Sequence, residues 1–159
     1  MTGAKKEDRT NEIRENSIKT IQKIKYEYKY DVIDGIGTII REIKYDTLGR
    51  IQSIYAGADF FRKTSTFEYD DKGNVIKRFD TNRKKDETTK TTIHYKYDKK
   101  GNLSEQIMYD KQGRITGRTK YKHDKKGNII ETITYKEDGS VSHRKESVYN
   151  RKGHRTKYI

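Results

Sequence analysis

The chain contains no cysteine and no proline among its 159 residues. The lack of cysteine excludes disulfide bonds and thiolate metal sites. The lack of proline means that every residue carries the backbone N–H that a β-ladder needs, so nothing interrupts strand pairing. No apolar run approaches the roughly 20 residues of a membrane-spanning helix, and no signal peptide is visible at the N-terminus. The sequence therefore predicts no transmembrane segment and leaves the compartment unknown.

Hydrophobic residues are also scarce, at 30% of the chain against 38% charged residues. That composition taken alone is typical of disorder. Its 37 Lys and Arg against 24 Asp and Glu give a formal net charge of +13. The 13 tyrosines suit a thin, partly wet core, because a tyrosine ring can be buried while its hydroxyl reaches water. The length predicts one domain.

Order is indicated by a recurring six-residue signature, Tyr-Asp-x-x-Gly-Asn/Arg. It stands at residues 45–50, 69–74, 97–102 and 109–114, with weaker copies at 123–128, 135–140 and 149–154. The Asp can accept hydrogen bonds from backbone N–H groups two residues on, and the Gly follows a type I turn in the left-handed region. The signature predicts a three-residue hairpin loop with a G1 bulge. The residues with this structural role are Asp46, Gly49, Asp70, Gly73, Asp98, Gly101, Asp110, Gly113, Asp124 and Gly127.

The loop geometry also predicts a register. The residue before each Asp should face the aliphatic residue that follows each turn. A slip of one residue would put the members of a pair on opposite faces, so agreement among the copies favours one register. The predicted pairs are Tyr45 with Ile51, Tyr69 with Val75, Tyr97 with Leu103, Tyr109 with Ile115, His123 with Ile129 and Tyr135 with Val141.

The segments between the turns alternate with period two, as strands do. Strict alternation places Tyr95, Tyr97, Tyr109, Tyr121 and Tyr135 on one apolar face and most of the cations on the other. Glu105 and Glu131 fall on the tyrosine side in this pattern. A single apolar face must be covered, so the sheet coils on itself, stays open as a half-pipe or pairs face to face. The sequence does not choose among these arrangements.

The spacing of the glycines predicts further turns upstream. Degenerate turns are expected within residues 55–59 and 80–86, and a loop near residues 34–37. The predicted fold is all-β, an antiparallel meander of about ten strands in a single-layer or coiled sheet. Residues 1–23 are expected to be a polar N-terminal lead, either disordered or with a short helix or early strand. Residues 24–159 are expected to form the meander domain.

The turn signature resembles the YD repeat of the Rhs type, over roughly residues 26–159. The resemblance implies a β-repeat protein of bacterial origin, often secreted or surface-associated, that acts as a scaffold or binding surface. It supplies no catalytic motif. Short MORN-variant repeats, which also place Gly after a Tyr-rich strand, are a weaker second similarity.

No motif for catalysis, metal binding or a cofactor is present. The histidines lack metal-ligand spacing, and there is no calcium loop, phosphate loop or dinucleotide fingerprint. We therefore expect no enzyme, no cofactor and no metal. The charge instead suggests a continuous basic face on neighbouring strands, able to bind phosphate or sulfate polymers. The bland alternative is a lysine-rich solvated face. The candidate polyanion-binding residues are Lys90, Lys96, Arg114, Arg118, Lys120, Lys122 and Arg144.

These observations favour a non-enzymatic binding or scaffold module that uses its sheet face or edge to contact a protein or a surface polymer. Two alternatives stay open. One is a polyanion binder for nucleic acid or acidic glycan through the basic face. The other is a structural fragment of an Rhs-like assembly, which would self-associate through the apolar sheet face.

Overall fold

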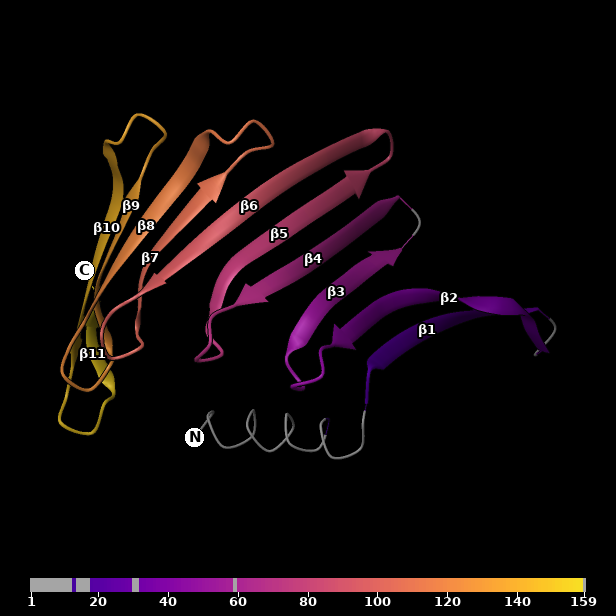
Figure 1. The fold of residues 1–159 in the computed structure, drawn as a ribbon, viewed down its shortest axis with the longest axis horizontal. Helices are drawn as coiled ribbons and strands as arrows, with labels where there is room; N and C mark the ends of the chain where they lie inside the picture. Colours follow the sequence, from indigo (N-terminus) through magenta and orange to yellow (C-terminus); the bar gives the residue numbers. More distant parts are fainter. Residues whose placement is uncertain (1–12, 14–17, 30–31, 59, 159) are drawn as a thin grey trace. The chain divides into compact units, whose positions relative to one another are not determined.

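The structure is a computed structural model that describes residues 13, 18–29, 32–58 and 60–158. Eleven strands lie in these ranges, and they follow one another across the sheet in chain order (Figure 1). Every described pair of neighbouring strands is antiparallel. The strands are β1 (Thr20–Lys29), β2 (Val32–Tyr45), β3 (Ile51–Ala58), β4 (Phe61–Tyr69), β5 (Val75–Lys84), β6 (Glu87–Tyr97), β7 (Leu103–Tyr109), β8 (Ile115–His123), β9 (Ile129–Tyr135), β10 (Val141–Tyr149) and β11 (Arg155–Tyr158).

This arrangement confirms the predicted all-β meander. The sheet is open and single-layered, with one strand more than expected among the described residues. The chain divides into two compact units. One comprises Met1–Glu68 with Phe79–Lys90, and the other comprises Tyr69–Arg78 with Thr91–Ile159. We call them the first and the second unit, and most of the signature turns lie in the second.

The turn prediction is confirmed in detail. Every signature glycine has a positive φ, between 73° at Gly49 and 84° at Gly127. Within each turn the glycine N–H donates to the carbonyl of the first turn residue, as from Gly101 to Asp98 at 3.0 Å. The predicted cross-strand pairs at five turns are present, from Tyr45 with Ile51 to Tyr135 with Val141.

Of the three upstream predictions, one was wrong, one was displaced and one was confirmed. The segment at residues 34–37 is part of β2, not a loop, and its Gly37 (φ 80°) sits at a register shift against β1. The turn after β3 follows Ala58, so residues 55–58 are strand, and Asp59 lies outside the described residues. The turn predicted within residues 80–86 is present at Lys85–Asp86, with φ 50° at Lys85, and residues 80–84 before it extend β5. Polar or glycine-rich composition does not end a strand whose backbone groups find a neighbouring strand.

At the N-terminus, residues 20–23 are the beginning of β1, which settles that part of the lead in favour of a strand. Ile13 is buried, with 4% of its surface exposed. Residues 1–12 and 14–17, where disorder or a helix was expected, lie outside the described residues. The proposed division at residue 23 therefore stays a prediction.

A second irregularity follows six of the seven signature turns and changes which residues share a face. Tyr97 lies opposite Leu103 as predicted, but the next residue back, Lys96, lies opposite Glu105. Ser104 is the extra residue of a bulge, and its hydroxyl donates to the Lys96 carbonyl at 3.1 Å. The residues at this position after the other turns are Gln52, Thr116, Ile130, Ser142 and Thr156.

Because directly opposed residues point to the same side of a sheet, each bulge reverses the alternation of the strand that follows. The prediction that all five tyrosines share an apolar face opposite the cations is therefore wrong. In the second unit, the side we call the Lys96 face carries Thr92, His94, Lys96, Glu105, Ile107, Tyr109, Arg118, Lys120, Lys122, Glu131, Ile133, Tyr135, Arg144 and Glu146. The other side, the Tyr95 face, carries Ile93, Tyr95, Tyr97, Leu103, Gln106, Met108, Gly117, Thr119, Tyr121, His123, Ile129, Thr132, Thr134, His143 and Lys145.

The core is correspondingly thin and divided between the faces. Ile93 on the Tyr95 face is 2% exposed and Ile107 on the Lys96 face is 8% exposed. Among the described residues, the buried polar side chains are Ser65, Asp80 and Glu105. Apolar burial thus accounts for only part of the order, and the remainder comes from the backbone ladder and the capped turns.

Candidate functional site

Each of the five signature turns that begin with Asp is built around the carboxylate of that residue. Asp98 Oδ1 accepts the backbone N–H of Lys100 at 2.8 Å and that of Asn102 at 2.9 Å. Asp98 Oδ2 accepts the side-chain amide of Asn102 at 3.0 Å. The Asn102 amide and these N–H groups hold the pKa of Asp98 below its usual value. The carboxylate is therefore fully engaged by its own turn, which leaves it little capacity to act on a ligand.

The sixth residue of the signature has a function that the sequence analysis missed. An asparagine there donates its amide to the turn Asp, as Asn128 does to Asp124 at 2.8 Å. An arginine donates its Nε instead, at 2.7 Å from Arg50 to Asp46 and at 2.7 Å from Arg114 to Asp110. The alternation of Asn and Arg at this position is the signal that could have revealed it, since both carry a donor that reaches back to the carboxylate.

The degenerate copies keep the geometry with other acceptors. In the last turn Asn150 Oδ1 accepts the N–H groups of Lys152 and His154, each at 3.0 Å. In the turn after β9 the first residue is Lys136, and Asp138 two residues later caps Ser140 through both its N–H, at 2.8 Å, and its hydroxyl, at 2.6 Å. The turn thus requires an oxygen acceptor near the glycine rather than one invariant residue.

The candidate cations divide between the two units. Lys90 belongs to the first unit and is described apart from the rest. In the second unit, Lys96, Arg118, Lys120, Lys122 and Arg144 do share one face, the Lys96 face. Arg114 lies outside the strands, in the turn between β7 and β8. The bulges bring Glu105 and Glu131 onto the same face, contrary to the sequence analysis.

Glu105 is the centre of an ion-pair cluster. Its carboxylate is 2.8 Å from Lys96 Nζ and 2.6 Å from Arg118 Nε. Glu105 is 6% exposed, and burial opposes its ionisation, but the hydrogen bonds from Lys96 and Arg118 outweigh that effect and lower its pKa. Two of the predicted polyanion-binding residues therefore already have an anionic partner within the sheet.

Three more cations of this set, Arg144, Arg114 and Lys120, also have partners nearby. Arg144 pairs with Glu131 at 2.6 Å and with Glu146 at 3.0 Å, which provides the buried Glu131 Oε1 with its counter-charge. Arg114 pairs with Asp110 at 2.6 Å. Lys120 Nζ lies 5.9 Å from the centre of the Tyr135 ring, where a cation–π contact is favourable. The face is thus a mixed-charge network rather than an open basic surface.

The described residues line at least two depressions. One shallow depression beside β9 and β10 is lined by residues that include Lys122, Glu131, Arg144 and Glu146. The other lies in the first unit and is lined by Phe60, Arg62, Arg83 and Lys85.

Groups of side chains suited to metal binding or catalysis are sparse among the described residues. Among residues 13, 18–29, 32–58 and 60–158, no group of three or more His, Cys, Asp or Glu is placed to hold a metal ion. Ser142 Oγ lies 2.8 Å from His143 Nδ1, but these are adjacent exposed residues, and within the described chain no acid is shown to orient the imidazole as a hydrolase triad needs.

In the part of the chain that the structure describes, no helix is long and apolar enough to cross a bilayer.

A further group of cations was not singled out from the sequence. The two tip positions of the turns that follow β6, β8 and β10 are all occupied by lysine or arginine, and all are exposed. They are Lys99, Lys100, Lys125, Lys126, Arg151 and Lys152. The repeated Lys-Lys-Gly and Arg-Lys-Gly triplets were the available signal, but the sequence analysis used them only to define turns.

Comparison with solved structures gives weak similarity. A TarM mutant from S. aureus in complex with fondaparinux, α-GlcNAc-glycerol and UDP aligns with 82% of the chain at 14% identity and a TM-score of 0.30. A second TarM structure aligns with 82% of the chain at 16% identity and a TM-score of 0.27. The chain spans about a fifth (22%) of the length of either protein.

No curated protein matches the chain. The model of one protein family does match, and it covers residues 5–159, nearly the whole chain. The match agrees with the YD-type turns and with the open meander, and the family name denotes a structural repeat shell. This chain belongs to the teneurin YD-shell family.

Proposed function

We propose that this chain is a non-enzymatic scaffold module that binds a protein partner or a surface polymer through a face or edge of its sheet. Membership of the YD-shell family indicates a structural role of this kind. The observation that carries the proposal is that apolar side chains remain exposed on both sides of a single-layer sheet. In the second unit these include Met108 and Ile129 on the Tyr95 face, 36% and 40% exposed.

The two faces of the second unit suit different contacts. Every acidic residue that the strand pairing places on a face there lies on the Lys96 face, where it is paired with lysine or arginine. The Tyr95 face carries tyrosines, threonines and aliphatic residues together with Gln106, His123, His143, Lys145 and Arg155, so few of its side chains carry a full charge. A protein surface that docks on the Tyr95 face would lose few charge–water contacts, which makes its desolvation cheaper.

The outermost described strand supports the same role. β11 is the last strand of the meander and pairs with β10 through Ser147 with Tyr158 and Val148 with Lys157. Its four residues are all exposed, and an outer strand presents unpaired backbone groups to any further strand. Strand addition at this edge would extend the sheet by the same ladder that builds it.

A second copy of the chain is the simplest protein partner to test. Sedimentation of the purified chain over a wide concentration range should show its mass rising with concentration. The change Ile129→Asp should reduce that association, because a buried unpaired carboxylate opposes a dry contact. The matched change Val141→Asp introduces the same charge on the Lys96 face, where Val141 is 54% exposed, and should have less effect.

Salt distinguishes this proposal from an electrostatic one. Association through the Tyr95 face should persist in high salt, because apolar burial is not screened. A chain that stays monomeric at every concentration, and that captures no neutral or acidic polymer from a glycan panel, would contradict the scaffold proposal.

A further inference from the structure

Most of the exposed tip cations of the second unit lie at one end of its strands. Because the strands run alternately up and down, the turns after β6, β8 and β10 all lie at the same end of their strands. Each contributes two adjacent cations at its tip. We call these six residues the basic turn edge: Lys99, Lys100, Lys125, Lys126, Arg151 and Lys152.

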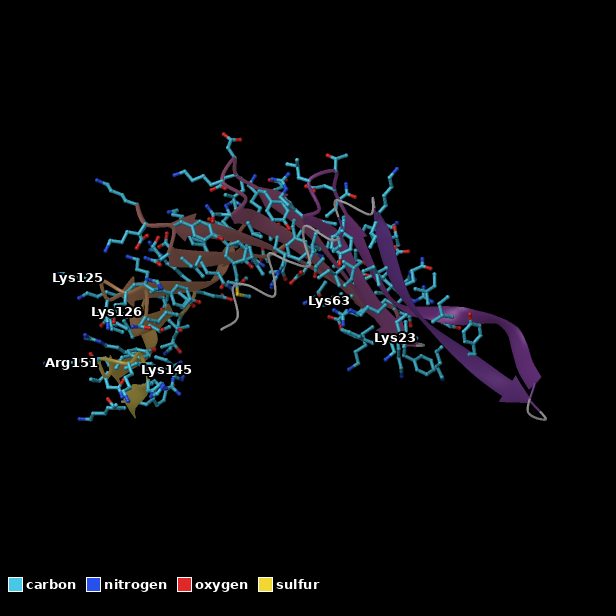
Figure 2. All side chains as sticks on the ribbon, turned by 90° about the horizontal axis from the view of Figure 1, so that it is seen from below. Lys23, Lys63, Lys125, Lys126, Lys145 and Arg151 are labelled. Carbon is cyan, nitrogen blue, oxygen red and sulfur yellow. The ribbon has the colours of Figure 1, made fainter. Side chains whose placement is uncertain are left out.

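Contacts between the turns show that they are neighbours. Lys126 Nζ donates to the Arg151 carbonyl at 2.8 Å, which joins the turn after β8 to the turn after β10. Figure 2 shows Lys125, Lys126 and Arg151 in the same part of the second unit. A Cβ on Gly127 would lie 3.2 Å from Asn102 Oδ1, so the turn after β6 adjoins the turn after β8. The six cations therefore form one row.

The opposite end of the same strands is different. The tip residues after β7 are Lys111 and Gln112, and those after β9 are Glu137 and Asp138. The turn geometry is the same at both ends, so the turn itself does not demand cations. The turn after β4 lies at the same end as the basic turn edge, and its tip residues are Asp71 and Lys72. The concentration of lysine and arginine is therefore a feature of the three turns after β6, β8 and β10 and not of the repeat.

The tip cations also differ from those on the Lys96 face. In the part of the chain that the structure describes, no acidic side chain forms an ion pair with any of the six. The two carboxylates in these turns, Asp98 and Asp124, are directed inward to backbone N–H groups and to Asn102 and Asn128. An incoming anion would therefore meet cations without an acidic counter-charge, and Lys126 would exchange only its hydrogen bond to the Arg151 carbonyl.

We propose that the basic turn edge binds the phosphate backbone of double-stranded nucleic acid without regard to sequence. Strands are about 4.8 Å apart, so turns on alternate strands are about 10 Å apart and the row spans about 20 Å. Duplex DNA presents one phosphate charge per about 1.7 Å of its axis. Cations on turns about 10 Å apart therefore find phosphates within reach, and their spacing does not have to match that of the phosphates. The site goes beyond the proposed scaffold role and uses other residues.

The chemistry of the tips favours a duplex over a single strand. Proteins that bind single strands stack the bases on aromatic side chains, and none of the six tip positions is aromatic. Five of the six cations are lysines, which act as flexible point charges rather than as bidentate readers of a base edge. The basic turn edge can therefore neutralise the phosphate charges of the nucleic acid, but it has no side chains suited to recognising the bases.

The test is fluorescence anisotropy of the full chain with a labelled duplex of mixed sequence, over a series of salt concentrations. The double variant Lys125→Gln with Lys126→Gln should bind about tenfold or more weakly. Its slope of log affinity against log salt should be shallower by about 2, because each phosphate contact contributes about 0.9. Melting curves of both proteins confirm that the turn is intact, since Asp124 and Gly127 are unchanged.

The matched control is Lys120→Gln with Lys122→Gln, which removes the same charge from the Lys96 face. This variant should lose less than twofold in affinity and keep the parental salt slope. Equal losses in the two double variants would overturn the proposal, because binding would then follow net charge and not the edge. Tighter, edge-dependent binding of a single strand or of heparin would overturn the assignment to duplex. Neither result bears on self-association, which tests the scaffold role separately.

Discussion

Glu105 lies directly across the strand pair from Lys96, and its carboxylate is 2.8 Å from the Lys96 ammonium. Strict alternation from Leu103 would have placed Glu105 on the other side of the sheet, with Tyr95. The single extra residue at Ser104 is what turns Glu105 toward Lys96 and Arg118. A structural bulge thus converts a predicted basic face into a paired one.

The Glu105 cluster predicts a measurable contribution to stability. The change Glu105→Ala should lower the free energy of unfolding by about 1–3 kcal/mol, because hydrogen bonds to a charged group are lost from a nearly buried site. The control Glu146→Ala removes a half-exposed carboxylate from an arginine that keeps Glu131, and should cost no more than about 0.5 kcal/mol. Urea unfolding of the variants measures both values.

A double-mutant cycle tests the face assignment itself. Lys96→Ala and Glu105→Ala should show a coupling energy of about 0.5 kcal/mol or more, since residues in one ion-pair network are not independent. Tyr95→Ala and Glu105→Ala should be nearly additive, because these side chains lie on opposite faces. A larger coupling for the Tyr95 pair than for the Lys96 pair would contradict the bulge.

The left-handed glycines predict an asymmetry between two positions. Gly101 has φ 82°, and a methyl group added there would have open space around it, so Gly101→Ala should lose about 1–2 kcal/mol from backbone strain alone. Gly117 lies within β8 without a positive φ, and a methyl there would contact Met108 Sδ at an ordinary 3.6 Å. Gly117→Ala should therefore be neutral or stabilising by up to about 1 kcal/mol. Equal thermal melting of the two variants would contradict the turn assignment.

The turn carboxylates predict loss of stability in acid. Hydrogen bonds from asparagine amides and backbone N–H groups lower the pKa of Asp70, Asp98 and Asp124. A carboxyl group whose pKa is lower in the folded state stabilises the fold above its unfolded pKa of about 3.9, and this contribution disappears as the pH falls through the folded value. Melting temperature should be flat above about pH 5 and should drop below about pH 4.

Asp98→Asn separates this titration from other acid effects. Asn150 already accepts both turn N–H groups in the last copy, so an asparagine at position 98 should preserve the fold. The variant should melt below the parent at neutral pH, and the difference should shrink as the pH falls below about 4. A constant difference at every pH would show that Asp98 does not contribute through its charge.

A buried polar pair in the first unit predicts a separate effect. Ser65 Oγ donates to Asp80 Oδ1 at 2.7 Å, and both residues are buried. Ser65→Ala should cost about 1 kcal/mol, the usual value of one hydrogen bond, or more if Asp80 is left poorly solvated. Ser53→Ala is the control, since that half-buried serine has no side-chain hydrogen bond within the described structure, and it should melt within about 0.5 kcal/mol of the parent.

The sequence alone determined where the signature turns lie and how the strands meet beside them. An acceptor oxygen, two free positions and a glycine specify one loop conformation through contacts within six residues, as Asp98 to Asn102 shows. Such local chemistry is readable without a tertiary structure. The pairs from Tyr45 with Ile51 to Tyr135 with Val141 follow from it directly.

The tertiary structure alone decided the faces and the edges. The bulge at Ser104 depends on backbone pairing between strands, which no period-two pattern reveals, and one extra residue reverses every side chain beyond it. The grouping of Lys126 with Arg151 likewise arises because a meander returns alternate turns to one end of the sheet. Lys126 and Arg151 are 25 residues apart in the chain and become neighbours because the two strands between them pair. That proximity exists only in the folded sheet.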